Sequence, residues 1–277
     1  MSAVAGADGR VPTPLGRRAL TLAARREHGP YVVICAPDPE GAIPQPGQFY
    51  MLAAVDRWGG GEDERPFLPR AFSVARIGEQ GLEFMLEDVG PGTARLCELQ
   101  VGDGLWVLGP LGHGFAAPED GRRALLCGGG VGTAPLAILQ DGLRAIGAQA
   151  PALLGFRDRA RAAGAELLHE PQVATDDGSV GDAGPVTELL RAELESDAHA
   201  VVYACGPPAM LEAVRALCEE RGVPAQLAME SGMACGYGAC YGCVVPVRGG
   251  GYVRLCVDGP VLDAGRLDTC LVAGAGH

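Results

Sequence analysis

Three cysteines lie within nine residues of one another near the C-terminal end of this chain, and a fourth follows thirteen residues later. Cys235, Cys240, Cys243 and Cys256 have the spacing C-x4-C-x2-C-x12-C, with glycines between the first three. A tight loop that folds three thiolates inward, completed by a more distant cysteine, is an arrangement that holds a [2Fe–2S] cluster. Glycine lets such a loop adopt left-handed backbone conformations and bring N–H groups close to sulfur. The spacing therefore predicts that these four cysteines bind a [2Fe–2S] cluster.

Other interpretations of this cysteine pattern remain open. Four thiolates can hold a structural zinc ion, although zinc sites usually carry two C-x2-C pairs and this segment has one. The cysteines could instead be free thiols, or Cys270 could replace Cys256 as the fourth ligand. A strand-like run, YVRL, directly precedes Cys256 and favours it. The other cysteines are interpreted as ordinary small residues, except for Cys205, which ends a predicted strand.

The composition argues against several classes of function. The formal net charge of −12 opposes binding to the phosphate backbone of nucleic acids. No run of residues approaches the roughly 20 apolar positions that cross a membrane. The N-terminal segment also lacks the apolar core of a signal peptide. We therefore expect no nucleic-acid or membrane partner, and a cytoplasmic protein whose cysteines are reduced or bind metal.

The pattern of apolar runs and breakers divides the chain into a leader and three parts. Residues 1–14 are rich in Ala, Gly and Pro and are expected to be a disordered leader. In residues 15–118, short apolar or alternating runs between Pro and Gly predict an antiparallel β-barrel. In residues 119–226, strands that alternate with helices predict an α/β domain with a parallel sheet. Residues 227–277 are rich in Cys and Gly and are expected to form a small cluster lobe. The expected strands cover 31–35, 48–52, 82–86, 124–127, 152–156 and 199–205, and the expected helices cover 134–146, 186–194 and 209–221.

Two motifs in the predicted barrel suit a flavin dinucleotide. In Arg70-Ala71-Phe72-Ser73, the arginine fork suits a pyrophosphate, the aromatic ring can lie against a flat ring, and the hydroxyl can bond a ring nitrogen. Further on, Gly90-Pro91-Gly92-Thr93 forms a glycine turn before a helical segment, which suits a phosphate. Alone, each motif is as well explained by a surface arginine or by a plain turn. Together, ahead of a nucleotide-binding domain, they predict a flavin site.

A strand, a glycine loop and a helix follow one another between residues 125 and 136. The free N–H groups and the positive dipole end of a helix N-terminus suit a pyrophosphate. Gly128, Gly130 and Gly132 are therefore predicted to bind a nicotinamide dinucleotide. The loop departs from the common G-x-G-x-x-G fingerprint, because Thr133 stands at the last glycine position. A tight turn without a ligand remains the alternative.

A second loop ends a later predicted strand. Cys205-Gly206-Pro207 follows the run that begins at His199, and parallel sheets place their ligands at the carboxyl ends of strands. We therefore expect this loop to close over the nicotinamide. Arg157 stands at the end of the strand expected over 152–156, with Asp158 beside it. No acidic residue is therefore clearly placed to form a hydrogen bond with the ribose hydroxyl groups. The preference for NAD or NADP stays open.

The motifs occur in the order found in the ferredoxin reductase family, which the chain resembles over roughly residues 45–210. They are R-A-F-S, G-P-G-T, G-G-G-V-G-T-A-P-L and Y-A-C-G-P-P. The C-terminal part is more specific. Residues 229–243 (MESGMACGYGACYGC) closely resemble the cluster loop of the electron-transfer subunits of class B (NAD-dependent) dihydroorotate dehydrogenases. Residues 175–181 (TDDGSVG), followed by GPVT, are typical of the same group.

This resemblance implies that FAD binds in the barrel, NAD in the second domain and a [2Fe–2S] cluster in the C-terminal lobe. It assigns to FAD the residues Arg70, Ala71, Phe72, Ser73, Met85, Leu86, Glu87, Gly92 and Thr93. It assigns to NAD the residues Gly128, Gly130, Gly132, Thr133, Cys205, Gly206 and Pro207. No catalytic residue is expected, because hydride transfer between two bound cofactors needs no protein acid or base. Phe72 stands where much of the wider family has tyrosine, so contacts through that hydroxyl are in doubt.

The resemblance also implies a partner. In this group the chain pairs with an FMN-containing catalytic subunit that oxidises dihydroorotate in pyrimidine (UMP) biosynthesis, as a two-plus-two heterotetramer. Electrons pass from FMN through the cluster to FAD, and then to NAD+ as hydride. Met233, Tyr237 and Tyr241 of the cluster loop are expected to face that subunit, because large apolar side chains are enriched at interface cores. The alternative is a sister reductase subunit of a sulfhydrogenase or a bifurcating transhydrogenase. In the latter an aspartate replaces the first cluster cysteine, so Cys235 argues against it.

Overall fold

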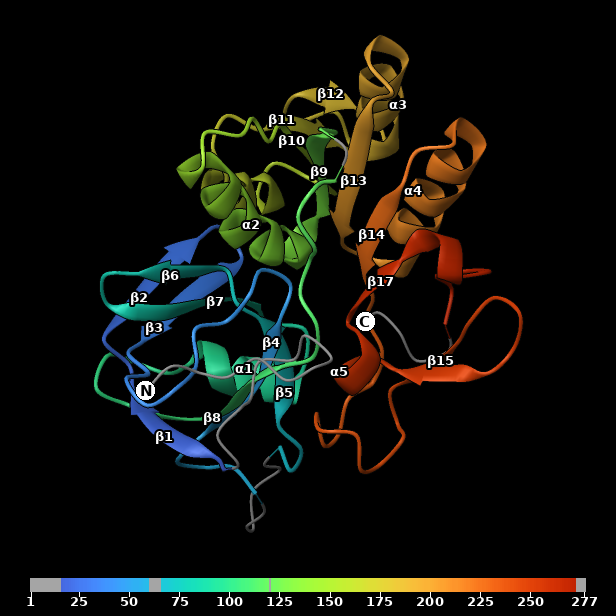
Figure 1. Cartoon of the computed structure of the whole chain (residues 1–277). Helices are drawn as coiled ribbons and strands as arrows, with labels where there is room; N and C mark the ends of the chain where they lie inside the picture. Colours follow the sequence, from blue (N-terminus) through green and yellow to red (C-terminus); the bar gives the residue numbers. More distant parts are fainter. Residues whose placement is uncertain (1–15, 60–65, 120, 273–277) are drawn as a thin grey trace.

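The computed structural model describes residues 16–59, 66–119 and 121–272 of the chain. The leader expected over residues 1–14 lies outside the described residues. Figure 1 shows a β-sheet domain, an α/β domain above it and a small C-terminal lobe beside both. Within the described ranges, no helix is long and apolar enough to cross a membrane.

Eight of the described strands form the N-terminal domain, as two antiparallel sheets with the orders β1-β8-β4-β5 and β2-β3-β7-β6. The strands are β1 (Arg18–Thr21), β2 (Ala24–His28), β3 (Tyr31–Ala36), β4 (Phe49–Ala54), β5 (Arg70–Ser73), β6 (Arg76–Gly78), β7 (Gly81–Glu87) and β8 (Gly104–Leu111), and helix α1 (Pro91–Cys97) joins β7 to β8. Alternate residues of β4 and β7, such as Tyr50, Leu52, Phe84 and Leu86, meet in one core between the sheets. The three strands expected in this domain are β3, β4 and β7. The two facing sheets bear out the prediction of an antiparallel β-barrel domain.

Six parallel strands form the sheet of the α/β domain, in the order β12-β11-β10-β9-β13-β14. They are β9 (Arg123–Gly129), β10 (Ala152–Phe156), β11 (Gln172–Thr175), β12 (Asp182–Ala183), β13 (Ala200–Cys205) and β14 (Ala225–Ala228). The helices are α2 (Ala134–Ala145), α3 (Val186–Ser196) and α4 (Pro208–Arg221), with 3-10 turns η1 (Gly130–Thr133) and η2 (Arg161–Leu167). The apolar face of α2 packs in one core, and those of α3 and α4 pack in another. Helices therefore cover both faces of the sheet, as a parallel sheet requires, and the predicted α/β domain is confirmed.

The cluster lobe shares a strand with the α/β domain. Strand β17 (Val261–Asp263) pairs antiparallel with β14 and becomes the seventh strand of that sheet. The pairing covers the backbone edge that β14 would otherwise expose. The boundary predicted between residues 226 and 227 consequently falls inside β14. The rest of the lobe contains the hairpin strands β15 (Val244–Pro246) and β16 (Tyr252–Arg254), helix α5 (Leu255–Asp258) and η3 (Ala264–Arg266).

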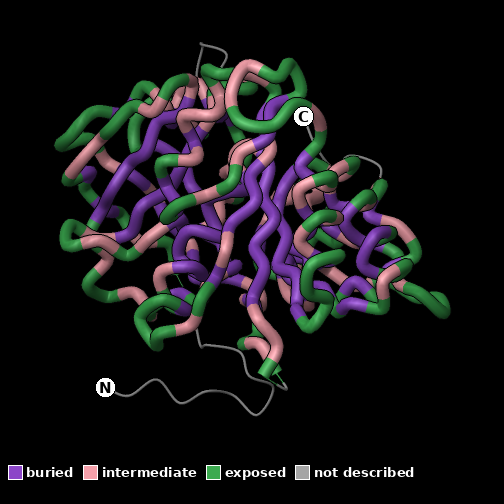
Figure 2. The backbone as a smooth tube through the Cα atoms, turned by 90° about the horizontal axis from the view of Figure 1, so that it is seen from above, coloured by how far each residue is buried: buried purple, intermediate pink, exposed green. Residues whose placement is uncertain are grey.

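Hydrophobic side chains join the barrel to the α/β domain. Tyr31 and Met85 of the barrel lie in the same core as Tyr203 of β13. At the rim of this interface, Arg76 Nε lies 2.6 Å from Asp141 Oδ2. Figure 2 shows buried backbone running through the middle of the molecule, with exposed backbone mainly at its periphery. The two domains are therefore packed together over an apolar surface.

Candidate functional site

The two predicted flavin motifs lie against each other. The R-A-F-S motif forms β5, and Arg70 Nη1 donates a hydrogen bond to the carbonyl oxygen of Leu68 at 2.6 Å. A Cβ atom added to Gly92, in the first turn of α1, would lie 2.5 Å from Nε of Arg70. The guanidinium group therefore occupies the space that any side chain at position 92 would need. Motifs more than fifteen residues apart in the sequence form a single cradle.

The hydroxyl group of Thr93 forms its hydrogen bonds within the turn that begins α1. Thr93 Oγ1 donates to the carbonyl oxygen of Gly90 and accepts from the backbone N–H of Val89, both at 2.9 Å. The Thr93 side chain is also nearly buried. What this turn offers a phosphate is therefore the backbone N–H of the first helical turn, which has no acceptor within the helix.

The remaining residues assigned to the flavin fall into two groups. Phe72 is half-buried at the border of the barrel core, and Ser73 beside it is half-buried as well. Met85 and Leu86 are 1% and 0% exposed, because Met85 packs in the core that the barrel shares with the α/β domain and Leu86 packs in the barrel core. Their side chains have no free surface for a ligand. Glu87, the last residue of β7, instead forms an ion pair with Arg161 across the domain interface, at 3.2 Å.

The predicted nucleotide loop joins β9 to α2 and touches the end of β13. Gly128 pairs with Cys205 in the parallel register of these strands. A Cβ atom on Gly132 would lie less than 3.0 Å from the carbonyl group of Cys205 and from the N–H of Gly206. A Cβ atom on Gly128 would collide with Leu136. These two glycines are therefore required by packing of the loop against its neighbours.

At position 130, glycine is favoured by the backbone conformation and not by packing. Its φ of 54° is left-handed, and nothing lies within 4 Å of the position of a Cβ atom. It is thus the predicted loop glycine that faces open space. Thr133, by contrast, is fully buried, and its Oγ1 donates to the carbonyl oxygen of Gly130 at 3.0 Å. The threonine that departs from the common fingerprint closes the turn η1.

The second predicted loop places a thiol beside a carboxyl group. Cys205 ends β13 and is 5% exposed, and burial followed by the charge of Glu230 raises the pKa of its thiol well above the usual range. Glu230 follows β14, the next strand of the sheet, and burial raises the pKa of its carboxyl group. Gly206 packs against Met210, while Pro207 is exposed before α4. Glu230 was not predicted as a site residue, because β14 is only four residues long and was not predicted.

The four predicted cluster cysteines gather as two pairs. Cys243 Sγ and Cys256 Sγ are 3.2 Å apart and both side chains are buried. Burial, followed by the hydrogen bond to Cys243, raises the pKa of Cys256 to about 12. At Cys235, burial acts to raise the pKa, but N–H groups of the loop, first that of Cys240, lower it to about 6. Cys240 is exposed and contributes a side-chain hydrogen bond to Cys235 as well.

Cys270 lies apart from these pairs. It is buried, and its backbone N–H donates to Glu212 Oε2 at 2.6 Å. Burial raises the pKa of its thiol to about 12, and the nearest charged groups are Glu212 and Arg215. Throughout residues 16–59, 66–119 and 121–272, no three His, Cys, Asp or Glu side chains are placed to hold a single metal ion.

The cluster loop packs on the barrel. Gly236 and Gly238 have left-handed φ angles of 79° and 89°. A Cβ atom on Gly236 would collide with the side chain of Met51 in β4. Met51 is the cross-strand partner of Ala71 in the R-A-F-S motif. The loop that carries the cysteines therefore lies one strand away from the flavin motif.

Solved structures define the class of protein to which this arrangement belongs. The structure of an NADH-dependent reduced ferredoxin–NADP oxidoreductase matches with a TM-score of 0.74 and 26% identity, covering 90% of both chains. The ferredoxin reductase of carbazole 1,9a-dioxygenase matches with a TM-score of 0.66 and 24% identity, covering 77% of this chain and 68% of that one. The fold is therefore that of the ferredoxin reductases, extended by a cysteine-rich lobe.

Sequence relatives give the family. Residues 230–268 match the model of the iron–sulfur cluster binding domain of dihydroorotate dehydrogenase B. The dihydroorotate dehydrogenase B (NAD(+)) electron transfer subunit of Geobacillus kaustophilus is 39% identical over 91% of this chain and 99% of its own length. That of Clostridium acetobutylicum is 36% identical over 78% of this chain and 83% of its own. The chain belongs to the family of dihydroorotate dehydrogenase B electron transfer subunits.

Proposed function

We propose that this chain passes electrons from an FMN-containing dihydroorotate dehydrogenase subunit, through a [2Fe–2S] cluster and FAD, to NAD+ in pyrimidine biosynthesis. The relatives that support this function are 39% identical over nearly the whole chain. The bifurcating oxidoreductase that it resembles in structure is only 26% identical. The alternative, a subunit of a bifurcating or sulfhydrogenase complex, is therefore not favoured.

One observation carries the proposed electron path. The cluster loop touches β4 through Gly236 and Met51, and Met51 pairs with Ala71 of the flavin motif in β5. Neighbouring strands of a sheet are about 4.8 Å apart. A cluster held by this loop and a flavin held by β5 would thus be neighbours. Electron transfer between them would need no movement of a domain.

The residues present fit FAD in the barrel. Arg70 lies over Gly92, so the guanidinium fork and the N–H groups of the α1 turn converge where a pyrophosphate would be held. Phe72 and Ser73 follow on the same strand, where they would contact the flavin ring. A bound flavin accepts electrons singly and passes them on in pairs as a hydride. We assign Arg70, Ala71, Phe72, Ser73, Gly92 and Thr93 to this site, and Glu87 to its border.

The loops after β9 and β13 fit a nicotinamide dinucleotide. Gly130 leaves open space before α2, where a helix N-terminus favours phosphate. Gly132 allows the two loops to touch, which places Cys205 beside the reacting ring in the proposed complex. The raised pKa of Cys205 keeps its thiol neutral, so it can pack against the nicotinamide without a competing charge. Gly128, Thr133, Gly206 and Pro207 support these loops.

The cysteine pairs fit a cluster with two metal atoms. Cys235 with Cys240, and Cys243 with Cys256, would each supply two thiolates to one iron. A structural zinc ion needs four thiolates around one point, and within the described residues no three metal-binding side chains are grouped to hold one ion. Cys256 rather than Cys270 is assigned as the fourth ligand, because Cys270 neighbours Glu212 and Arg215 instead.

The partner and the location follow from the same proposal. The family name describes an electron transfer subunit, which works with a catalytic subunit. We infer that two copies of each assemble as a heterotetramer. None of the ten cysteines, all of which lie within the described residues, forms a disulfide. This is expected in a reducing compartment, and we infer that the assembly is cytoplasmic.

Reconstitution of the two subunits tests this function. The isolated chain should oxidise NADH with an artificial acceptor such as ferricyanide, and it should fail to oxidise dihydroorotate. Addition of the FMN subunit should produce dihydroorotate-dependent reduction of NAD+. Reduction of NAD+ by dihydroorotate with this chain alone, or no coupling after the partner is added, would contradict the proposal.

A further inference from the structure

The short segment η2 of the α/β domain lies directly against the barrel. A Cβ atom on Gly164, within η2, would lie 2.9 Å from the ring of Tyr31 in β3. Near the end of η2, Glu166 Oε2 lies 2.9 Å from Nδ1 of His28, the last residue of β2. Two parts of this segment therefore contact the barrel, which limits how far η2 can move relative to it.

Arg161, the first residue of η2, forms ion pairs with two acidic residues from different domains. Its Nε lies 3.2 Å from Oε1 of Glu87, the residue that ends β7 of the barrel. Its Nη1 lies 2.8 Å from Oδ2 of Asp158, two residues after the end of β10. A guanidinium group carries its N–H donors in one rigid plane, so it can hold two carboxylates in a fixed relation. Arg161 therefore links the two domains at a defined point.

Both oxygens of the Asp158 carboxylate accept hydrogen bonds from Arg161. Oδ1 accepts from the backbone N–H of Arg161 at 2.9 Å, and Oδ2 accepts from its side chain. These bonds, first the one from the backbone N–H, lower the pKa of the Asp158 carboxyl group, so it is charged at neutral pH. The loop that follows β10 is consequently fixed to the same arginine that reaches the barrel.

The two partners of Arg161 lie at the borders of the two proposed cofactor sites. We assign Glu87 to the border of the flavin site. Asp158 follows β10 at the carboxyl edge of the parallel sheet, where nucleotides bind. The barrel would hold the flavin and the α/β domain would hold the nicotinamide, so the distance between the two rings depends on how these domains are placed. Arg161 stands where it can set that distance.

We propose that Arg161 is a positioning residue for hydride transfer, which holds the nicotinamide site at reacting distance from the flavin through Asp158 and Glu87. The proposal rests on the proposed function, since it requires both cofactors. Reacting atoms must lie about 3–3.5 Å apart, and a displacement of about 1 Å can cost roughly 100-fold in rate. The side chain of Arg161 is 33% exposed, and ion pairs of exposed residues contribute little to stability. Loss of Arg161 should therefore affect the rate of hydride transfer and not the folding of the chain.

Single-turnover reduction of the flavin by NADH tests this role in the chain loaded with FAD and its cluster. Arg161→Gln should lower the rate constant at saturating NADH roughly tenfold. The Kd for NADH, the FAD content and the melting temperature should stay at their wild-type values. Arg161→Lys keeps the charge but lacks the planar fork that holds two carboxylates. Its rate constant should therefore lie between those of the wild type and Arg161→Gln.

Arg76→Gln is the matched control for loss of an ion pair between the two domains. Arg76 Nε lies 2.6 Å from Asp141 Oδ2 across the same interface, and neither residue is assigned to a cofactor. The flavin of this variant should be reduced at the wild-type rate. The double variant Glu87→Gln/Arg161→Gln should be no slower than the slower of its two single variants, because residues that act through one contact do not have additive effects.

The outcomes separate the positioning role from the proposed function. Equal rate constants for Arg161→Gln and Arg76→Gln, while NADH reduces the wild-type flavin normally, would overturn the positioning role and leave the function intact. Loss of FAD from Arg161→Gln in place of slower reduction would also overturn it, because Arg161 would then hold the flavin itself. A wild-type chain whose flavin is not reduced by NADH would overturn the proposed function.

Discussion

The nucleotide loop after β9 and the cluster loop before β15 are both rich in glycine, for different physical reasons. In the nucleotide loop, Gly132 has no room for a Cβ atom beside the backbone of Cys205. In the cluster loop, Gly236 and Gly238 also need left-handed φ angles. The first loop connects a buried strand to a buried helix, whereas the second has no helix or strand between Ala228 and Val244 of the described chain. The nucleotide loop is therefore positioned by the sheet, and the cluster loop by its contacts and its ligands.

A methyl group in the nucleotide loop should have the largest effect. Gly132→Ala would place Cβ against the carbonyl group of Cys205, and backbone cannot move aside as a side chain can. A displacement of about 1 Å near reacting groups can cost roughly 100-fold in rate. We expect kcat/KM for NADH to fall about 100-fold in the ferricyanide assay, with iron and flavin retained.

Gly142 in α2 provides the control for this substitution. Nothing lies within 4 Å of its Cβ position, and alanine is favoured over glycine in a helix by about 1 kcal/mol. Gly142→Ala should therefore raise the melting temperature and leave NADH oxidation unchanged. Equal activity of Gly132→Ala and Gly142→Ala would show that the contact with Cys205 does not position the site.

Removal of a cluster ligand should act on the other loop alone. Cys240→Ser or Cys256→Ser should lower iron and sulfide to well below stoichiometric amounts, because one iron atom would lose one of its two thiolate ligands. FAD content should remain, since the flavin residues lie in the barrel. Cys270→Ser should keep the iron. Iron loss from Cys270→Ser together with full iron in Cys256→Ser would reverse the assignment of the fourth ligand.

The flavin cradle should be less sensitive than either loop. Arg70→Ala removes a charge-assisted hydrogen-bond donor, worth about 1.5–3 kcal/mol. FAD should then dissociate roughly tenfold or more readily on dilution, as measured by flavin fluorescence in the filtrate. Arg57→Ala, at an exposed position of the same domain, should retain FAD. Identical FAD retention in the two variants would show that Arg70 does not help to hold FAD.

The smallest effect is expected at Glu230, which lies between strand β14 of the α/β domain and the cluster loop. Burial raises the pKa of this carboxyl group above its unfolded value of about 4.3. Its contribution to stability is therefore complete below that value and is lost as the pH rises through the raised pKa. Glu230→Gln should raise the melting temperature relative to wild type at pH 8, but not at pH 4. Glu79→Gln, in an exposed turn, should show no such difference, and parallel pH profiles for both variants would refute the burial effect.

The features that could be predicted from the sequence are those that depend on the spacing of residues within a short stretch and on the Gly and Pro residues that end strands and helices. The cysteine pattern, the glycine loop after β9 and the R-A-F-S motif each lie within a short stretch, and the structure brings the two flavin motifs together. The pairing of β17 with β14 escaped prediction because it joins short segments more than thirty residues apart. Glu230 was missed with it. Met85 and Leu86 were assigned to the flavin through the family resemblance, and both side chains are buried, Met85 in the core that the barrel shares with the α/β domain and Leu86 in the barrel core.

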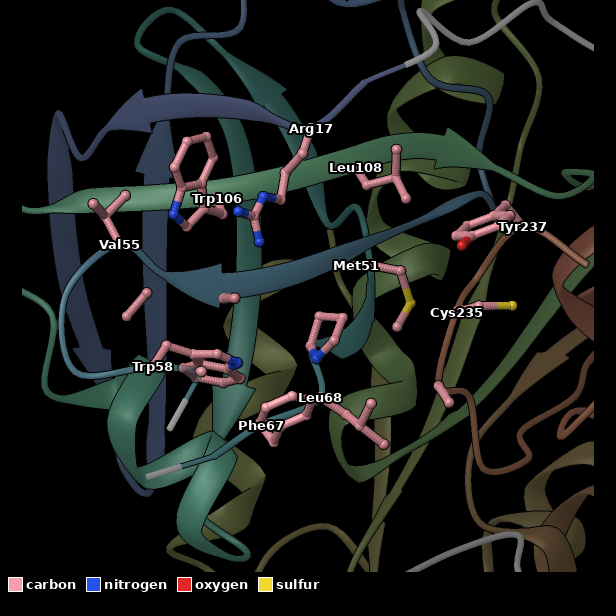
Figure 3. A pocket seen from close by; sticks show the side chains of 15 residues that line it. Arg17, Met51, Val55, Trp58, Phe67, Leu68, Trp106, Leu108, Cys235 and Tyr237 are labelled. Atoms are coloured by element: carbon pink, nitrogen blue, oxygen red, sulfur yellow. The ribbon is translucent and has the colours of Figure 1, made fainter. Parts of the chain in front are cut away.

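The reasons for individual glycines also depend on distant contacts. Gly128 and Gly132 were predicted as phosphate-binding residues, and the structure gives both a packing role against Leu136 and Cys205. The groove lined by Trp58, Trp106 and Tyr237 (Figure 3) was not predicted either, because its walls come from the barrel and from the cluster loop. Sequence spacing indicates which residues form a loop, but not what the loop packs against.

Reduction of the isolated chain by NADH tests whether electrons pass between NAD, FAD and the [2Fe–2S] cluster within this one chain. With FAD and iron–sulfur content established, anaerobic addition of NADH should bleach the flavin absorption band and produce the electron paramagnetic resonance signal of a one-electron-reduced [2Fe–2S] cluster. In Cys240→Ser the bleaching should persist and the signal should vanish. A chain that binds both groups but shows neither bleaching nor the signal with NADH would contradict the account.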